Sequence, residues 1–194
     1  MAKYENWLSP VAALAPSFPQ GLEALPFCAQ VNLRGNPGDP EFMSRVKGEL
    51  GFALPTVPNT VAGRKKCRAL WLGPDEWLIV EEGDARFRDA PEGALAAQLE
   101  QALEGLHHAV TDVSANRIRL ELSGPEVRTV LMKSCELDCH PAVFRPGQVA
   151  QTLLAKAQVI LEKPAEDRVH LYVRNSFALY VAEWLVDAFR YSGE

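Results

Sequence analysis

Two short segments alternate apolar and polar residues, and this alternation restricts the possible folds more than any other feature of the sequence. Their apolar positions are Ile118, Leu120 and Leu122 in one segment and Val169, Leu171 and Val173 in the other. Successive side chains of a strand point to opposite faces of a sheet, so the pattern predicts half-buried strands over 117–122 and 169–173. Strands of a doubly wound parallel sheet are instead apolar on both faces. The sequence therefore favours a mostly antiparallel sheet.

Local signals predict a hairpin, a helix and a strand in the middle of the chain. The apolar runs 69–72 and 77–80 flank Gly73-Pro74-Asp75-Glu76, which is typical of a hairpin. Four leucines recur at helical spacing and predict a helix that ends near Gly105: Leu95, Leu99, Leu103 and Leu106. A further strand is expected over 110–113.

A second helix is predicted after Ser123, because Ser123 and Glu126 have the spacing of a capping box. Its expected buried face is Val127, Val130, Leu131 and Met132, and Pro141 requires it to end near Ser134. One long strand is expected where apolar residues share a face: Leu153, Ala155, Ala157, Val159 and Leu161. Asn175-Ser176 then cap a final helix over 177–190 that is mostly covered by the sheet or by a partner. These elements predict an α+β fold with helices packed against the sheet.

Prolines are concentrated near the N-terminus, where eight of the 14 lie within the first 58 residues. Because proline removes a backbone donor and fixes φ, we expect no long regular element there. Residues 1–27 are nevertheless rich in apolar side chains, which need a surface to pack on. The prediction is an extended apolar arm over 1–27, wrapped over its own domain or over another subunit, followed by a single domain over 28–194.

Composition narrows the class of protein. A hydrophobic content of 47% suffices for a core, and a net charge of −5 does not match a nucleic-acid binder. The basic cluster Arg64-Lys65-Lys66-Cys67-Arg68 is expected to be a solvated turn. The N-terminus resembles no signal peptide, and no apolar run is long enough to span a membrane. Four scattered cysteines fit a reducing compartment, so we expect a cytoplasmic protein.

The stretch "SCELDCHP" raises the question of a metal or redox site, since it contains Cys135, Cys139 and His140. A structural zinc site needs four ligands, usually including a CxxC-type pair, and the spacing here is CxxxC. Glu136 and Asp138 are expected to raise the pKa of the thiols. We therefore predict a structural loop at a helix end, while a thiol or metal site remains a weaker alternative.

Other polar residues are predicted to be structural. His107-His108 follow a helix end, where an imidazolium is favourable, and Asp112 with Ser114 indicates a strand-end turn. His170 is expected to be partly exposed on the polar face of its strand. The sequence contains no glycine-rich phosphate motif, no nucleophile elbow and no HExxH motif.

Several longer stretches resemble the gamma subunit family of heterotetrameric sarcosine oxidases. The resemblance extends from about Ser9 to Ala188 and includes "NLRGNPGDPEF", "LPTVPNTVAG", "RALWLGPDEWLIV", "VTDVSANRIRLELSGPEV", "CELDCHPAVFRPGQVAQTLLAKAQVIL" and "RNSFALYVAEWLVDA". "LGPDEWL" and "HPAVFRPGQVAQTLLA" are its most specific parts. The family is related in fold to the folate-binding glycine-cleavage T-protein, which implies a T-protein-like domain.

The resemblance implies a non-catalytic subunit of a four-subunit flavoenzyme. That enzyme oxidises sarcosine to glycine with formation of hydrogen peroxide and 5,10-methylenetetrahydrofolate. Its beta subunit would hold FAD, FMN would lie between alpha and beta, alpha would bind NAD and tetrahydrofolate, and delta would bind zinc. The chain itself would bind no cofactor, and alpha is the expected direct contact.

No catalytic, cofactor-binding or metal residue is therefore expected in this chain. T-protein-like catalytic domains carry an acidic residue in the hairpin that faces folate, and its expected counterpart, 155–160, has no carboxylate. The expected contact elements are the arm, 4–27, and the final helix, 176–190. The alternative is a stand-alone folate-binding protein resembling an aminomethyltransferase.

Overall fold

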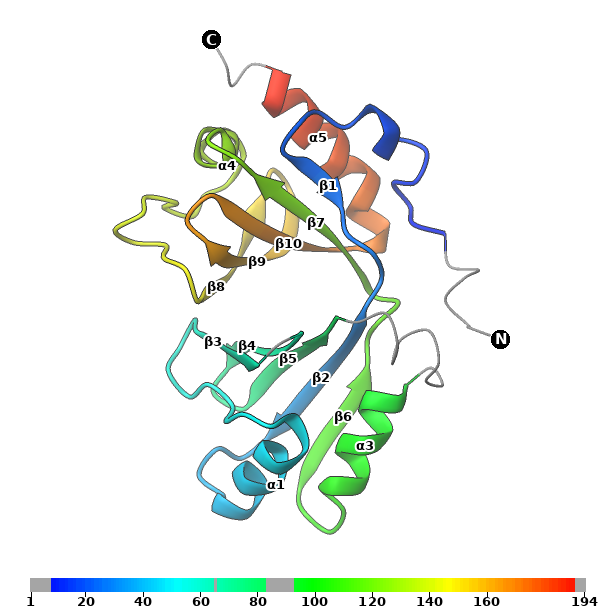
Figure 1. Cartoon of the computed structure of the whole chain (residues 1–194), viewed down its shortest axis with the longest axis vertical. Helices are drawn as coiled ribbons and strands as arrows, with labels where there is room; N and C mark the ends of the chain where they lie inside the picture. The colour runs from blue at the N-terminus through cyan, green and yellow to red at the C-terminus, as the bar shows by residue number, and fades with distance from the viewer. Residues whose placement is uncertain (1–7, 65, 83–92, 191–194) are drawn as a thin grey trace. The chain divides into compact units, whose positions relative to one another are not determined.

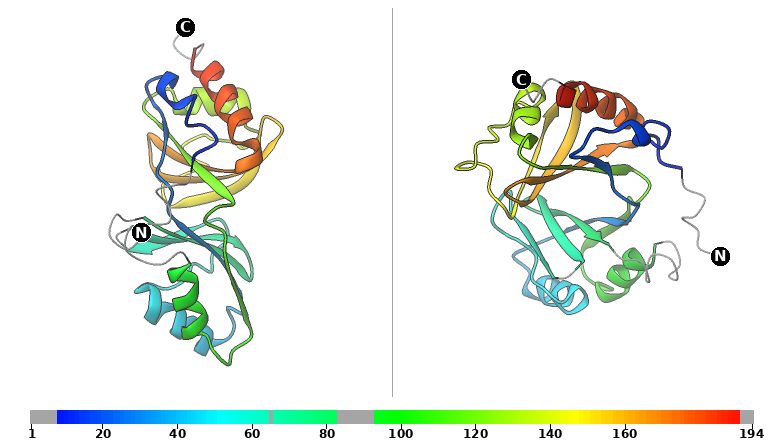
Figure 2. Two further views of the ribbon diagram at one scale, coloured as in Figure 1. Left: turned by 90° about the vertical axis from the view of Figure 1, so that its right-hand side faces the viewer. Right: turned by 45° about the horizontal axis from the view of Figure 1, so that its top comes forward.

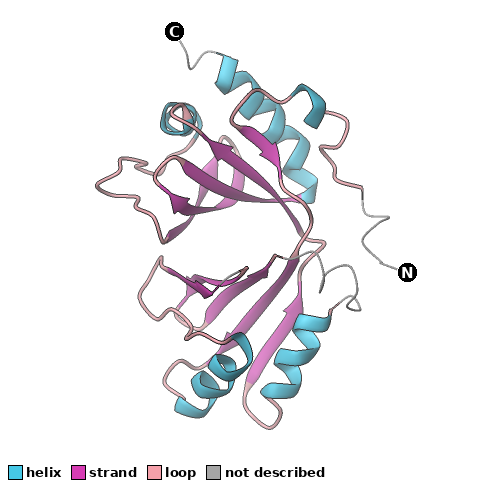
Figure 3. Ribbon diagram, in the orientation of Figure 1, coloured by secondary structure: helices cyan, strands magenta, loops and turns pink. Residues whose placement is uncertain are grey.

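The structure is a computed structural model, and it describes residues 8–64, 66–82 and 93–190. These residues form two compact units (Figure 1). One unit comprises Phe27–Ser114, and the other combines Leu8–Pro26 with the chain from Ala115 onward. In each unit the helices pack on an antiparallel sheet (Figure 3), so the predicted α+β class is confirmed.

The Phe27–Ser114 unit has a five-stranded sheet in the order β3-β4-β5-β2-β6. Its strands are β2 (Ala29–Gly35), β3 (Val61–Arg64), β4 (Cys67–Gly73), β5 (Glu76–Glu81) and β6 (His108–Asp112), and its helices are α1 (Pro40–Leu50) and α3 (Ala94–Ala102). The predicted hairpin is confirmed, because β4 and β5 pair antiparallel. The leucine-rich helix is also confirmed, although it ends at Ala102 rather than near Gly105.

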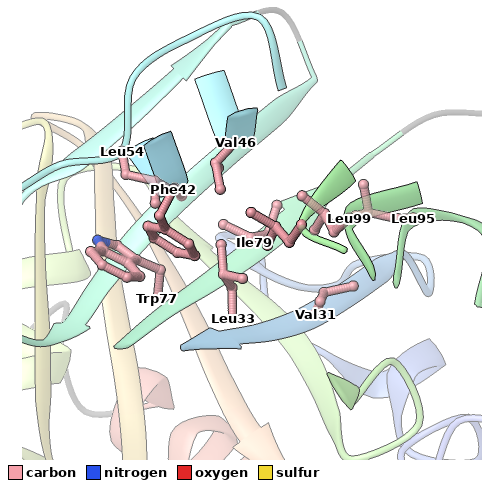
Figure 4. Close-up of a cluster of buried hydrophobic side chains, with 11 residues drawn as sticks. Val31, Leu33, Phe42, Val46, Leu54, Trp77, Ile79, Leu95 and Leu99 are labelled. Atoms are coloured by element: carbon pink, nitrogen blue, oxygen red, sulfur yellow. The ribbon is translucent and has the colours of Figure 1, made fainter. Parts of the chain in front are cut away.

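Both helices of this unit lie on the same face of its sheet, and their apolar side chains meet those of β2 and β5 in one core (Figures 2 and 4). Trp77 lies at the centre, fully buried, with its ring centroid 6.1 Å from that of Phe42. The indole nitrogen of Trp77 donates to the carbonyl of Pro55 at 2.8 Å, so its polar atom is satisfied inside the core. Leu95 and Leu99 add the buried face of α3.

Helix α1 shows that the expectation of no long regular element in the first 58 residues was wrong. Pro40 occupies the first turn, where proline is tolerated because its missing N–H would have no helical partner. The carboxylate of Asp39 accepts from the amides of Glu41 and Phe42, and Gly51 ends the helix with φ of 78°. Proline therefore begins this helix rather than preventing it.

The second unit has a five-stranded sheet in the order β1-β7-β10-β9-β8. Its strands are β1 (Leu22–Ala24), β7 (Arg117–Ser123), β8 (Gln148–Leu154), β9 (Ala157–Ala165) and β10 (Arg168–Arg174). Helices α4 (Val127–Ser134) and α5 (Ala178–Arg190) lie on one face of it (Figure 2), and the short 3-10 helices η2 (Ala15–Ser17) and η3 (Asn175–Phe177) complete the unit. Both alternating strands, β7 and β10, are central in this sheet.

Three local predictions for this unit were wrong. The expected long strand through 153–161 is a hairpin, because Ala155 adopts a left-handed conformation with φ of 50° and the chain reverses between β8 and β9. The expected capping box is absent, because Glu126 is itself the residue before α4 and its side chain makes no cap hydrogen bond. Met132 belongs to the exposed face of α4 and is 64% exposed.

The predicted arm contributes directly to the second unit. Val11 is fully buried, and Leu22 pairs with Leu122 where β1 joins the edge of the sheet. The amide of Leu25 donates to the carbonyl of Arg119 at 3.0 Å. Residues 8–26 therefore pack on their own unit, whereas residues 1–7 lie outside the described residues. The single domain over 28–194 stays a prediction.

Among the described residues, no helix has the length and apolar character that crossing a membrane requires.

Candidate functional site

Cys135, Cys139 and His140 lie where α4 ends and the chain turns toward β8. Cys135 is the C-cap residue of α4 and forms an isolated β-bridge with Leu154. Cys139 is 6% exposed, whereas His140 is exposed and its Nδ1 accepts from the amide of Ala142 at 3.1 Å. The predicted position of Cys135 at a helix end is confirmed. His140 is used in local turn geometry.

The pKa values of the two thiols differ from the expectation. A hydrogen bond with Cys139 lowers the pKa of Cys135 to about 6, against the opposing effects of burial and of Glu136. The same bond raises the pKa of Cys139, as do its burial and Asp138. The acidic neighbours do raise both values, as expected, but for Cys135 the hydrogen bond outweighs them.

Within 8–64, 66–82 and 93–190, no group of three or more His, Cys, Asp or Glu side chains has a geometry that holds a metal ion. His140 is the third residue of the sequence cluster, and its Nδ1 accepts from a backbone amide. The structure thus brings the two cysteines together and directs the histidine elsewhere.

A buried polar cluster on the central strands of the second unit was not predicted. Nδ1 of His170 lies 3.3 Å from Glu162, and Nε2 lies 3.1 Å from Glu121. The hydroxyl of Tyr172 donates to Glu162 at 2.6 Å. His170 is only 9% exposed, so the expectation of a partly exposed side chain was wrong.

Strand register explains this cluster. His170 of β10 is directly opposite Glu121 of β7 on one side and Glu162 of β9 on the other. Neutral imidazole has one N–H and ionised carboxylates only accept, so both contacts are hydrogen bonds when the ring is an imidazolium or when one carboxyl is protonated. No sequence pattern indicates this cluster, because the three residues come together only when the strands pair.

A cavity of about 420 Å³ lies near the other end of the same strands. Arg117 and Arg174, which are directly opposite each other on β7 and β10, contribute to its lining together with Gln151, Gln158 and Glu136. Like charges at opposite positions repel, so this lining suits an anionic group better than a cationic one.

The final helix exposes an aromatic surface. Its inner face is buried against the unit, as expected, through Val181, Leu185 and Phe189. On the outer side lie Tyr180 and Trp184, which together with Phe177 at the end of η3 we define as the aromatic stripe; they are exposed by 36%, 42% and 43%. The expectation of a mostly covered helix therefore holds for the inner face alone within this chain.

The aromatic stripe is held in place by contacts with α4 and along α5. The indole nitrogen of Trp184 donates to the hydroxyl of Ser134 at 2.8 Å. The rings of Tyr180 and Trp184 lie 6.1 Å apart between centroids. Leu179 of α5 and Met132 of α4 are also exposed, by 46% and 64%. Tyr180 and Trp184 are thus held on a regular helix.

The remaining polar predictions are local. The amide of Ser114 donates to Asp112 at 2.8 Å, which confirms the strand-end turn. Nδ1 of His108 lies 2.9 Å from the carbonyl of Leu106, and Nε2 lies 3.3 Å from Glu100. The basic cluster is only partly the expected solvated turn: Arg64 ends β3, Lys66 is in the turn, and Cys67-Arg68 begin β4, where Arg68 pairs with Glu82 at 2.8 Å. Lys65 lies outside the described residues.

The chain is similar in sequence to subunits of one enzyme. The model of the "Sarcosine oxidase, gamma subunit family" matches residues 34–191. Sarcosine oxidase subunit gamma of Corynebacterium sp. (strain P-1) is 39% identical over 189 residues, covering 93% of this chain and 88% of that protein. The Arthrobacter sp. subunit gamma is 38% identical with the same coverage.

Solved structures give the same result. A chain of the heterotetrameric sarcosine oxidase from Corynebacterium sp. U-96, in complex with pyrrole 2-carboxylate, superposes with a TM-score of 0.84 and 33% identity over 97% of both chains. The glycine cleavage aminomethyltransferase T of Bartonella henselae superposes with a TM-score of 0.61 and 19% identity, covering 88% of this chain and 46% of that one. The second likeness shows a shared fold and confirms the predicted T-protein-like fold.

Proposed function

The chain belongs to the sarcosine oxidase gamma subunit family, and we propose that it is the gamma subunit of a heterotetrameric sarcosine oxidase in which it docks on its partners rather than reacting with substrate. The complex would oxidise sarcosine to glycine with formation of hydrogen peroxide and 5,10-methylenetetrahydrofolate. It would work in the cytoplasm.

The observation that carries this proposal is the aromatic stripe. Phe177 of η3 and Tyr180 and Trp184 of α5 are large apolar rings that remain 36 to 43% exposed in the isolated chain. Aromatic side chains are enriched at the energetic centres of protein interfaces, because they bury a large area with little loss of conformational freedom. A regular helix that presents them needs no rearrangement before it binds.

We assign the alpha subunit as the partner that covers the stripe. One similar solved chain is part of a heterotetramer. In such an assembly another subunit can cover the exposed aromatic stripe. Beta and delta complete the assembly, and FAD, FMN, NAD, tetrahydrofolate and zinc belong to those three chains. This chain would hold no catalytic, cofactor-binding or metal residue.

The buried cluster of His170, Glu121 and Glu162 fits this role. Its polar atoms face one another at 3.1 to 3.3 Å, and Tyr172 completes the coordination of Glu162. A cluster that is satisfied internally stabilises one arrangement of a sheet, and this explains its residues without a substrate.

The proposal is tested by purifying the chain alone and together with candidate alpha, beta and delta chains. We expect the isolated chain to be colourless and to show no sarcosine-dependent peroxide formation, whereas the co-purified complex carries flavin absorbance and oxidises sarcosine. Flavin bound stoichiometrically by the isolated chain would contradict the assignment.

The stand-alone folate-binding alternative has its own test. Titration of the isolated chain with tetrahydrofolate in a calorimeter is expected to give no saturable heat. Micromolar binding with one site per chain would favour that alternative over a docking subunit.

A further inference from the structure

The outer side of α5 carries two carboxylates beside the rings of the aromatic stripe. Glu183 and Asp187 are both exposed, and we call them the acidic pair. Residues three or four positions apart are neighbours on a helix surface, so Glu183 adjoins Tyr180 and Asp187 adjoins Trp184. The rings and the carboxylates therefore share one patch of the helix surface.

The acidic pair is unfavourable for the helix itself. Glu183 and Asp187 are four positions apart, and like charges at this spacing repel each other. Asp187 also lies in the last turn of α5, where the negative end of the helix dipole disfavours a carboxylate. Neither carboxylate makes an ion pair in the part of the chain that the structure describes. The stability of α5 alone therefore does not account for the acidic pair.

Two cations lie near the C-terminal end of α5, and both leave the acidic pair without a salt bridge. The ammonium of Lys133 on α4 donates to the carbonyl of Ala188 at 3.2 Å, which stabilises the end of the helix. Arg190 is the last residue of α5 and follows Asp187 by three positions, yet the two form no ion pair among the described residues. The acidic pair thus remains available to a cation from outside the chain.

The rings next to the acidic pair are held in place. The indole nitrogen of Trp184 donates to the hydroxyl of Ser134 at 2.8 Å, and the ring centroid of Trp184 lies 6.1 Å from that of Tyr180. Because Ser134 occupies the indole N–H, the indole presents its ring surface to a partner. The face of an aromatic ring attracts a cation, and tryptophan is the best of the aromatic residues in this respect.

We propose that the acidic pair, together with the rings of Tyr180 and Trp184, binds an arginine side chain of the alpha subunit. This inference rests on the proposed docking function and adds the chemistry of the partner segment. A positive group beside Glu183 and Asp187 offsets their mutual repulsion, so charge complementarity selects a cation. Arginine fits better than lysine, because its planar guanidinium stacks on an aromatic face and pairs with carboxylates as a fork, whereas an ammonium is a strongly hydrated point charge.

The test compares the unmodified chain with the double variant Glu183→Gln with Asp187→Asn, which keeps the shape of both side chains and removes their charges. Surface plasmon resonance measures binding to immobilised alpha chain at low and at high salt. We expect the double variant to bind at least about tenfold more weakly at low salt and to lose most of the salt dependence. Glu49→Gln, at an exposed position on α1 in the other unit, is the matched control and is expected to bind like the unmodified chain.

The stability of the isolated double variant separates binding from folding. Since the two carboxylates of the acidic pair repel each other, we expect removal of both charges to raise the midpoint of urea denaturation. A lower midpoint would show that the acidic pair stabilises the helix, and it would overturn the proposal.

Modification with phenylglyoxal, which reacts with arginine side chains, identifies the partner residue. We expect one arginine of the alpha chain to be protected when this chain is bound at saturation, and to react again when the double variant is bound at saturation. Peptide mapping by mass spectrometry measures the protection. Protection of the same arginines by both proteins would overturn the proposal.

Two other outcomes are distinguishable from these. Equally tight binding of the double variant and the unmodified chain would overturn this inference while leaving the docking function in place. Failure of the unmodified chain to bind the alpha chain would overturn the proposed function itself. A dimer of the isolated chain that the double variant abolishes would assign the patch to a second copy of this chain, and would also overturn the inference.

Discussion

The hydroxyl of Tyr172 donates a 2.6 Å hydrogen bond to Oε2 of Glu162, and both residues are almost completely buried. The same oxygen faces Nδ1 of His170 at 3.3 Å. A carboxylate removed from water needs such donors, because an unsatisfied buried charge is far more costly than the net contribution of any one bond. The polar side of the central strands is therefore part of the stability of the second unit.

Replacement of Tyr172 by Phe removes the donor while keeping the ring. We expect the variant to lose about 2 kcal/mol of unfolding free energy, since hydrogen bonds to charged groups contribute about that amount. Urea denaturation followed by circular dichroism measures it. Tyr180→Phe is the matched control, because Tyr180 is on the exposed side of α5. Equal stability of the two variants would show that the Glu162 contact is not stabilising.

Replacement of His170 by Leu leaves Glu121 and Glu162 on adjacent strands without the ring between them. The carboxyl groups then lose one of their hydrogen-bond partners, and leaving a buried polar group unsatisfied costs about 2 kcal/mol, so we expect a loss of that size. Adding Glu162→Gln is expected to recover part of it, which a double-mutant cycle measures. His140→Leu, at an exposed position, controls for loss of a histidine. A His170→Leu variant as stable as that control would show that the cluster does not stabilise the fold.

Alkylation of Cys135 reports the effect of its neighbour. A pKa lowered to about 6 keeps the thiolate populated at neutral pH, whereas an ordinary thiol titrates near ~8.5. We expect the rate of Cys135 alkylation by iodoacetamide to be constant above neutral pH and to fall as pH decreases through the lowered pKa. In Cys139→Leu, which lacks the donor, we expect the alkylation rate to fall at a higher pH. Identical pH profiles of the two proteins would contradict an effect of Cys139 on Cys135.

The same contact fixes the sign of a stability effect. The lowered pKa of Cys135 contributes stability that is fully present above its unfolded pKa and is lost as pH falls through its folded pKa. The raised pKa of Cys139 has the opposite effect on stability. Its stabilising contribution is fully present, and constant, below the unfolded pKa of Cys139. Stability linked to the pair is therefore expected to decrease with falling pH between the unfolded and the folded pKa of Cys135.

The aromatic stripe is tested by single substitutions that keep the inner face of α5. Phe177→Ser and Tyr180→Ser are each expected to weaken binding to the alpha chain by about tenfold or more, as truncation of an interface aromatic does. Surface plasmon resonance with immobilised alpha chain measures this. Glu49→Ser, at an exposed position on α1, is the control. Loss of binding in the control alone would place the contact elsewhere.

Sequence reasoning predicted the elements that depend on local periodicity. The hairpin of β4 and β5, the leucine-rich α3 and the alternating β7 and β10 all follow from patterns within one segment, and the structure confirms them. Local ambiguity explains the failures. Ser123 and Glu126 match a capping box in letters, yet α4 begins after Glu126, whereas Asp39 supplies a true cap that the proline-rich context concealed.

The polar residues of the site depend on pairing between distant segments. Arg119 and His170 alternate with apolar residues and look exposed along the chain, but they are 4% and 9% exposed. Arg119 donates to the carbonyl of Pro26 at 3.0 Å, a partner 93 positions away. Alternation identifies the two faces of a strand, but what covers the polar face is decided by register and by the rest of the chain.

The most direct test of the docking role is native mass spectrometry of a tagged chain co-expressed with candidate alpha, beta and delta chains. We expect the tag to retain a complex that contains this chain and the other three, with flavin and sarcosine-dependent peroxide formation in the same fraction. Recovery of the tagged chain by itself, while the other three chains assemble into an active complex without it, would contradict the role.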